Sequence, residues 1–440
     1  MARVVVVGGG FGGLAAAARL AKLRHDVTLV ERAAALGGAL ATVTTPDAEG
    51  FAWDAGPTQT LLPAVIRDLF RKSGRPLEGE LELQAVDPVR EHRFEDGAVL
   101  ALPGGSRARQ LEAWEAVSSG LGRRWVDHVA SYGDTWELLR REWFERPWDP
   151  DVAPKELTRL LGSRESLHRR LRRTLPDERL RLVAAHTAVV AGHDPRDVPA
   201  WAGLTVHLEQ RFGAWTAPGG LATLGGVLTE RLATRGVTVL TGTTALDVVV
   251  RDGRAVAVDT NGEHGRAAID ADHVVVAVDP RRLPALAPYV RRTMPAFPPV
   301  VCHVALQGDV PDLPHEVVLH GEPLLVARTG GRAPEGGAAW TVLGRGHIAE
   351  DPLLALARHG IDVRARVVAR VDRTPRDLVE AWGGSPSGTL WQGPRTAHDR
   401  LGPRTPVAGV LAAGAHATTG FGLPFVGLSA ALVAEVVGPA

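Results

Sequence analysis

A run of β-branched residues at positions 4–7 stands at the start of the chain and ends directly at a cluster of glycines. Such a run is typical of a parallel strand that is buried on both faces. Small and apolar residues continue over residues 14–23, which predicts a helix, and residues 26–30 predict a second strand. The pattern therefore predicts a strand, a tight glycine turn, a helix and a parallel strand in succession.

The same alternation of strands and helices returns in two later segments. In the first, a helix to about Ala233 ends at Gly236, and apolar strands follow at residues 237–240, 245–250 and 273–278. In the second, an apolar strand at residues 407–415 leads through a glycine loop to a helix from about Phe425. Together with the first 30 residues, these segments predict an α/β architecture.

Residues 60–211 and 290–385 interrupt this alternation. Residues 107–182 have the pattern of several helices separated by glycine and proline, and strands are expected on both sides of that region. The expected strands are residues 81–83, residues 93–100 with an Asp96-Gly97 turn, residues 300–306 and residues 339–343. We expect a mixed sheet capped by helices, built from two separated stretches of chain.

Composition narrows the functional classes. Fifty basic and fifty acidic side chains leave no net charge, which argues against a nucleic-acid partner held by phosphate contacts. The single cysteine, Cys302, excludes an internal disulfide framework and a cysteine-based metal cage, and we expect no metal site. No signal-peptide pattern or spanning apolar segment is recognised, so we expect a cytoplasmic protein that contacts a membrane at most peripherally.

The glycine cluster carries the strongest chemical signal. Gly8, Gly10 and Gly13 satisfy the G-x-G-x-x-G pattern between the first predicted strand and helix, and Glu31 follows the second strand. The first glycine permits the turn, the second lets backbone approach a pyrophosphate, and the third lets the helix pack on the strand. A carboxylate at Glu31 binds ribose hydroxyls and repels a 2′-phosphate. This pattern predicts a dinucleotide site for NAD or FAD.

Two more glycine turns favour FAD over NAD. Gly37-Gly38 and Asp54-Ala55-Gly56-Pro57-Thr58 follow the second strand, where an NAD dehydrogenase continues into another βα unit. Together with Glu31, these turns resemble the FAD-binding start of the phytoene desaturase-like flavoproteins, which are relatives of the amine oxidases. Residues 212–280 and the C-terminal glycine loop resemble later segments of that family.

The resemblance implies a Rossmann-like FAD-binding domain of the GR2 or amine-oxidase type, beside a discontinuous substrate domain with a mixed sheet and a helical cap. The FAD-binding domain would comprise residues 1–59, 212–289 and 386–440, and the substrate domain residues 60–211 and 290–385. FAD would be bound non-covalently. The cofactor-binding residues implied are Gly8, Gly10, Phe11, Gly12, Gly13, Glu31, Arg32, Gly37, Gly38, Ala39, Gly56, Pro57, Thr58, Ala245, Gly414, Ala415, Gly422, Leu423 and Pro424.

Two positions depart from the family pattern. Ala39 stands where the family usually has arginine, and residues 417–419 are Ala-Thr-Thr where it commonly has Thr-His-Pro. These departures weigh against carotenoid desaturation more than against FAD, which is held through many backbone contacts.

The activity implied is transfer of a hydride from an apolar substrate of the isoprenoid or polyene class to the flavin N5. His416, in the C-terminal glycine loop, is the candidate catalytic residue, and a loop histidine bonded to backbone is the alternative. Other functions left open are an oxidase of an amine or natural-product intermediate, a flavin isomerase without net redox change, and a non-enzymatic lipid carrier of the Rab dissociation-inhibitor type.

Two features of the middle segment allow more than one interpretation. Tryptophan recurs every 11 residues, close to three helical turns, at Trp114, Trp125 and Trp136. This spacing favours aromatic packing in the core between helices over the lining of an apolar substrate channel or contact with a membrane interface. Residues 164–181 carry seven arginines against three acids, which favours a solvated face over contact with anionic lipid. The oligomeric state is left open.

Overall fold

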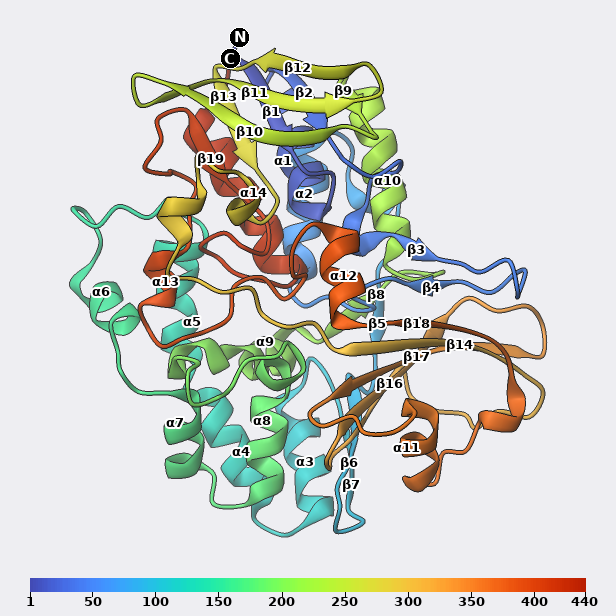
Figure 1. Cartoon of the computed structure of the whole chain (residues 1–440). Coiled ribbons are helices and arrows are strands. Elements are labelled where there is room, and N and C mark those ends of the chain that lie inside the picture. Colours follow the sequence, from blue (N-terminus) through green and yellow to red (C-terminus); the bar gives the residue numbers. More distant parts are fainter.

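A five-stranded parallel sheet forms the core of one half of the molecule (Figure 1). The computed structural model describes residues 1–440. In spatial order the strands are β19 (Val410–Ala412), β13 (His273–Val276), β1 (Arg3–Val7), β2 (Asp26–Val30) and β9 (Thr238–Leu240). The predicted strand, turn, helix and strand at the N-terminus are therefore confirmed, with the helix beginning earlier, at Phe11.

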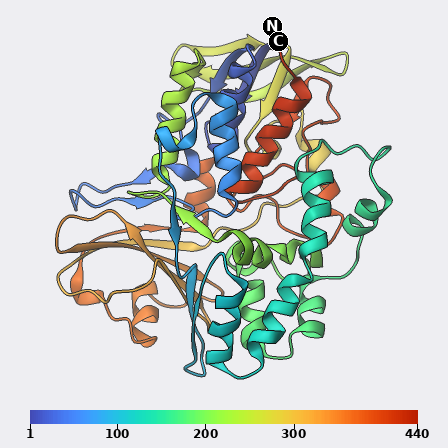
Figure 2. The same cartoon turned by 180° about the vertical axis from the view of Figure 1, so that it is seen from behind.

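Successive valines of β1 pack into two different cores, as expected for a strand covered on both sides. Val4 and Val6 contact the helix side, whereas Val5 and Val7 contact a three-stranded antiparallel sheet. The helices, seen from behind in Figure 2, are α1 (Phe11–Lys22), α2 (Pro63–Ser73), α10 (Ala222–Thr234) and α14 (Leu423–Val437). The antiparallel strands are β10 (Thr244–Arg251), β11 (Arg254–Gly262) and β12 (Gly265–Asp270).

The other half contains the expected mixed sheet, which has seven strands (Figure 1). All its neighbouring strands are antiparallel except the pair β15 and β6. In spatial order the strands are β18 (Val367–Arg373), β14 (Val300–Gln307), β17 (Gly337–Arg345), β16 (Leu324–Gly331), β15 (Glu316–Leu319), β6 (Arg90–Arg93) and β7 (Val99–Leu102). Two segments far apart in the sequence therefore complete one sheet.

Helices from the middle of the chain pack beside this sheet around a second large core (Figure 1). They are α3 (Arg107–Val117), α4 (Leu121–Ala130), α5 (Gly133–Leu139), α6 (Lys155–Leu161), α7 (Leu167–Thr174), α8 (Glu178–Val190) and α9 (Thr205–Phe212). Trp114, Trp125 and Trp136 are all buried in this core, in agreement with the core interpretation. Shorter helices elsewhere are α11 (Pro352–Arg358), α12 (Pro375–Trp382) and α13 (Thr396–Asp399).

Short ladders link the two halves. The strands β3 (Thr42–Val43) and β4 (Trp53–Asp54) pair with each other, as do β5 (Gln84–Val86) and β8 (Ala214–Thr216). All five segments of the two proposed domains contribute strands to these sheets and ladders, and the division itself stays a prediction. None of the helices is both long and apolar enough to cross a bilayer.

Several expected strand boundaries are wrong. Residues 81–83 form no strand, because the backbone pairs instead at residues 84–86, opposite β8. The hairpin with an Asp96-Gly97 turn expected at residues 93–100 is confirmed, but its strands extend outward, since β6 begins at Arg90 and β7 ends at Leu102. The strand expected at residues 407–415 shortens to β19, since Gly409 and Gly414 both adopt positive φ and interrupt the ladder.

Candidate functional site

The first glycine turn leaves the start of α1 open. Gly8 has a φ of 104°, and a Cβ on Gly13 would lie 1.8 Å from the Gly8 carbonyl oxygen, so neither position accepts a side chain. A Cβ on Gly10 would meet nothing within 4 Å. Gly10 is the N-cap of α1 and supplies no side-chain hydrogen bond, which leaves the N–H groups at Phe11 and Gly12 available to an anion.

Glu31 lies at the end of β2 and faces this turn. One carboxylate oxygen accepts a hydrogen bond from the Gly9 N–H at 2.7 Å, and the other accepts from the Ala33 N–H at 2.8 Å. These two bonds fix the carboxylate while each oxygen keeps a free lone pair. The neighbouring Arg32 points elsewhere, because its guanidinium donates to the carbonyls of Glu380 and Ala381 at the end of α12.

The second and third glycine turns stack against the first. The Gly37 N–H donates to the Gly9 carbonyl at 2.9 Å, and a Cβ on Gly38 would lie 3.1 Å from the Gly10 Cα. A Cβ on Gly56 would in turn lie 2.7 Å from the carbonyl oxygen of Ala39. Close backbone contact at each step explains glycine at these positions.

Thr58 ends the third turn, directly after Pro57, and its hydroxyl group has no hydrogen-bond partner. The Thr58 carbonyl accepts a hydrogen bond from the Thr216 hydroxyl at 2.9 Å. The Thr58 hydroxyl is buried and has no partner within the protein. Buried hydroxyls are almost always hydrogen-bonded, so this group fits a bound ligand.

The C-terminal glycine loop reaches the first turn. A Cβ on Gly12 would lie 2.8 Å from the Gly414 Cα, which places these turns in backbone contact although 402 positions separate them in sequence. Helix α14 begins at Leu423 and Pro424, with Gly422 as its N-cap and no capping side chain. Ala415 packs by its backbone against Gly388. The first turns of α1 and α14 therefore both offer uncapped N–H groups near one another.

Ala245 lies at the far side of Glu31. It stands two positions after Thr243, whose N–H donates to the Glu31 carbonyl at 2.9 Å. Ala245 pairs with Thr260 in the antiparallel sheet. This position is compatible with the adenine contact expected for its backbone.

His416 is buried beside Asp279 and Arg281. Burial lowers its pKa to about 4, so the imidazole is neutral at neutral pH. The Arg281 guanidinium donates to Nδ1 at 3.3 Å, which places the ring proton on Nε2. Nε2 therefore carries a proton that it can donate, and it forms no hydrogen bond within the protein.

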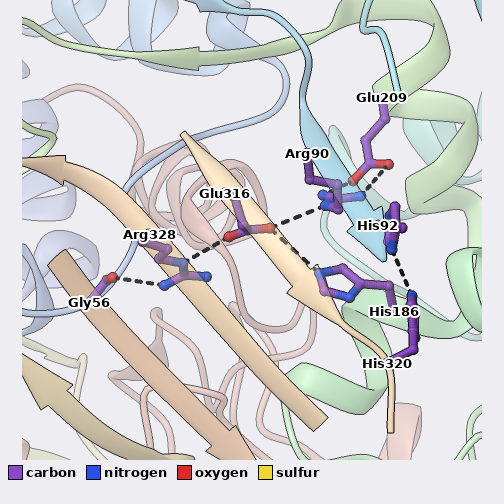
Figure 3. Close-up of polar contacts among 8 residues, drawn as sticks. All are labelled: Gly56, Arg90, His92, His186, Glu209, Glu316, His320 and Arg328. Atoms are coloured by element: carbon purple, nitrogen blue, oxygen red, sulfur yellow. Dashed lines mark hydrogen bonds and ion pairs between the residues drawn. The ribbon is translucent and has the colours of Figure 1, made fainter. Parts of the chain in front are cut away.

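A buried charge network extends from the substrate half to the third glycine turn (Figure 3). Arg90 binds both oxygens of Glu209 and also Glu316, at 2.6–3.1 Å. Arg328 binds Glu316 at 2.8 Å and donates to the Gly56 carbonyl at 3.4 Å. The nearby cations, with Arg328 first, hold the pKa of Glu316 well below its usual range despite the opposing effect of burial. The network thus positions Gly56.

The sequence pattern that defines the flavin containing amine oxidoreductases matches residues 11–437. The chain belongs to this family.

Curated relatives of the chain agree with the resemblance seen in the sequence. The chain is 28% identical to a neurosporene-forming phytoene desaturase of Cereibacter sphaeroides over 64% of this chain and 56% of the relative. It is 34% identical to a zeta-carotene-forming phytoene desaturase of Myxococcus xanthus over 52% of this chain and 45% of the relative. The chain thus aligns with about half the length of these relatives.

Solved structures show the same fold. Cyclohexylamine oxidase from Brevibacterium oxydans superposes with a TM-score of 0.65 at 16% identity, covering 99% of both chains. The expected α/β fold of the FAD-binding type is confirmed. FAD, the expected cofactor, is confirmed by membership of this flavin containing family, and the open turns and the orphaned Thr58 hydroxyl fit it. The individual site residues stay predictions.

Sequence reasoning missed the charged groups that become buried only in the fold. Glu316 begins the otherwise apolar strand β15, and a lone charge in such a strand was the available signal, whereas Arg90 lies in a strand of polar residues that gives no such signal. His193 had no comparable signal, because its partner Trp391 lies 198 positions away, and Arg400 had none because it contacts the carbonyl of Thr389 without any charged partner.

Proposed function

We propose that this chain is an FAD-dependent oxidoreductase that takes a hydride from an apolar substrate of the polyene or isoprenoid class. The contacts of Gly12 with the Gly414 backbone and with Val426 in the first turn of α14 carry the proposal, because they bring two uncapped helix starts to one site. The carotenoid-desaturating relatives support the substrate class.

The chain's own groups divide the binding task. The N–H groups at the start of α1 bind the pyrophosphate, and the Glu31 carboxylate accepts hydrogen bonds from the ribose. The Thr58 hydroxyl supplies one further hydrogen bond. The N-terminus of α14 stabilises negative charge beside the flavin.

Bound FAD supplies the hydride-accepting chemistry at its N5 atom. The protein's contribution is to hold the reacting carbon of the substrate in place and to exclude water. Large buried aromatic side chains lie beside the C-terminal glycine loop, with the Phe144 ring centroid 5.2 Å from that of Phe425. They provide an apolar boundary for such a substrate.

His416 takes the role of a hydrogen-bond donor in this proposal. The catalytic role expected from the sequence stays a prediction, and the ring proton on Nε2 favours donation from that atom over removal of a proton by it. His416→Gln retains a donor and would keep most activity, whereas His416→Leu would not.

An absorbance spectrum of the purified full chain tests the proposal. We expect flavin bands that bleach under anaerobic conditions when an acyclic polyene is added, and no bleaching with primary amines. Bleaching by amines alone would identify an amine oxidase. A colourless protein that cannot be reconstituted with FAD would contradict the proposal.

Peripheral membrane contact is a second part of the proposal, since a polyene substrate partitions into lipid. Helix α7 exposes Arg169, Arg172 and Arg173 on one side. Arginines near an anionic surface each contribute about 1 kcal/mol. Co-sedimentation with anionic vesicles at low salt tests this contact, and failure to bind there would remove it.

A further inference from the structure

Four buried N–H groups near the C-terminal glycine loop have no hydrogen-bond acceptor. They belong to His193, Trp201, Arg345 and Arg400. Buried donors are rarely left unpaired in a folded protein, because they lose their hydrogen bonds to water and gain none in return. A group of four that shares the same surroundings therefore points to a missing acceptor.

Arg400 is a buried cation. One guanidinium nitrogen donates to the Thr389 carbonyl at 3.0 Å, and the group lies 4.2 Å above the Trp391 ring. It forms no ion pair, and burial alone lowers its pKa to about 9, so it stays charged at neutral pH. A Cβ on Gly420 would lie 3.2 Å from this guanidinium, which places Arg400 against the glycine loop.

Arg345 is a second cation without a carboxylate partner. It ends β17, and its Nε donates to the Val190 carbonyl at 2.8 Å. Burial alone lowers its pKa to about 10. A Cβ on Gly192 would lie 2.9 Å from one of its terminal nitrogens, so Arg345 contacts the residue next to His193.

His193 lies between the two arginines. Its Nδ1 accepts a hydrogen bond from the backbone N–H of Trp391 at 3.4 Å, which leaves the ring proton on Nε2, and Nε2 has no partner. Both arginines lower its pKa further than burial does alone, to about 3, so the ring is a neutral donor. The Phe421 ring lies 5.1 Å from it by centroid.

The walls around these donors are aromatic. Trp201 and Trp391 pack edge to face with centroids 5.5 Å apart, and Phe421 belongs to the glycine loop itself. A buried and a half-buried positive charge with no negative partner are unfavourable unless an anion joins them. Aromatic walls favour an anion that has a large apolar body over a free inorganic ion.

We propose that Arg400, Arg345 and His193 bind the carboxylate of an apolar carboxylic acid, which is the substrate or product of the flavin site. The inference rests on the proposed function and specifies the substrate class more closely. Guanidinium groups suit a carboxylate because they present planar pairs of donors. The apolar body of the acid then lies between the aromatic side chains.

Titration calorimetry on the FAD-loaded full chain tests this proposal, with all-trans-retinoate as the probe and its methyl ester as the matched neutral compound. We expect retinoate to bind at least about tenfold more tightly than the ester. Arg400→Gln should remove that preference. Arg400→Lys keeps the positive charge but loses the paired N–H donors of the guanidinium group, so it should keep part of the preference for retinoate.

Arg376→Gln is the control variant, since it removes one positive charge from an exposed pair with Glu380. It should leave the preference unchanged. The flavin spectrum and the thermal midpoint of each variant show whether the fold and the cofactor are retained.

Three outcomes would overturn the proposal. The first is equal binding of retinoate and its ester by a protein with a normal flavin spectrum, which leaves the oxidoreductase proposal intact. The second is an Arg400→Gln variant with a shifted flavin potential and unchanged retinoate binding, which assigns Arg400 to the flavin. The third is competition by inorganic phosphate as strong as by retinoate, which shows a simple anion site.

Discussion

Gly12 and Gly414 are in direct backbone contact, with the Gly414 Cα 2.8 Å from the place where a Cβ on Gly12 would lie. Helix α1 begins beside one of these residues, and the loop that leads to α14 begins at the other. The contact closes the site that we assign to FAD.

Gly12→Ala should impair cofactor binding. The added methyl would overlap Gly414 backbone atoms at 2.8 and 3.0 Å, which cannot move away as a side chain would. Overpacking of this kind costs about 1–3 kcal/mol, so FAD affinity should fall by at least about tenfold. Fluorescence titration of the apoprotein with FAD measures it.

The matched control is Gly226→Ala, in α10. Its added methyl meets nothing within 4 Å and replaces glycine in a helix, so it should raise stability by up to about 1 kcal/mol. Equal loss of FAD binding in both variants would contradict the assignment of this contact to the cofactor site.

Glu31→Gln should weaken FAD binding, because it loosens the first glycine turn. The carboxylate accepts from two backbone N–H groups, at Gly9 and Ala33, and an amide has only one oxygen. One of these N–H groups would face an amide nitrogen, at a cost of about 1–3 kcal/mol. Reconstitution with FAD measures the loss, and Asp26→Asn at the exposed start of β2 serves as control.

Glu316→Gln should destabilise the substrate half strongly. Its carboxylate contacts Arg90 and Arg328, and Arg90 and Glu316 are fully enclosed (Figure 3). Removing one partner of a buried ion pair costs about 3–5 kcal/mol, because the remaining charges lose their counterion.

Denaturant unfolding followed by tryptophan fluorescence measures this cost. Glu380→Gln removes a carboxylate from an exposed pair and should cost less than about 1 kcal/mol. Similar midpoints for the two variants would show that the network adds little to stability.

Stability should fall as pH drops below about 6.5. Burial lowers the pKa of His128 to about 4 and that of His320 to about 3. The unfolded chain therefore binds more protons than the folded chain between these values and about 6.5, so acid favours unfolding. Glu316, whose folded pKa is also lowered, adds to the loss at lower pH.

Thermal midpoints between about pH 7.5 and about pH 5 measure this dependence. His320→Gln removes one of the titrating groups while an amide can keep the hydrogen bond to His92, so its dependence should be shallower. His264→Gln, at an exposed turn, is the control. A flat wild-type profile would contradict the prediction.

Local patterns predicted the dinucleotide half of the fold well. The valines of β1, the glycine turn and Glu31 all lie within the first 31 residues, so one short segment contains both the element and its chemistry. The substrate half was harder, because its sheet joins residues 90–102 to residues 300–373. The strand misplaced at residues 81–83 shows this, since its neighbour β5 is defined by pairing with distant β8.

Buried charges were the least predictable part of the site. Arg90 meets Glu209 and Glu316 only after three distant segments pack together. Arg400 has no carboxylate partner at all, and an arginine of this kind cannot be told from a solvated one by sequence pattern.

The parallel sheet takes its edge strand β19 from residues 410–412, whereas β1 lies at residues 3–7. Until a growing polypeptide reaches Ala412, β13 therefore presents bare amide and carbonyl groups along one side. Such unpaired edges recruit other chains, and slow long-range pairing prolongs the exposure. Ribosomal synthesis thus passes through an aggregation-prone stage, and premature termination upstream of Val410 should yield insoluble material instead of a smaller working enzyme.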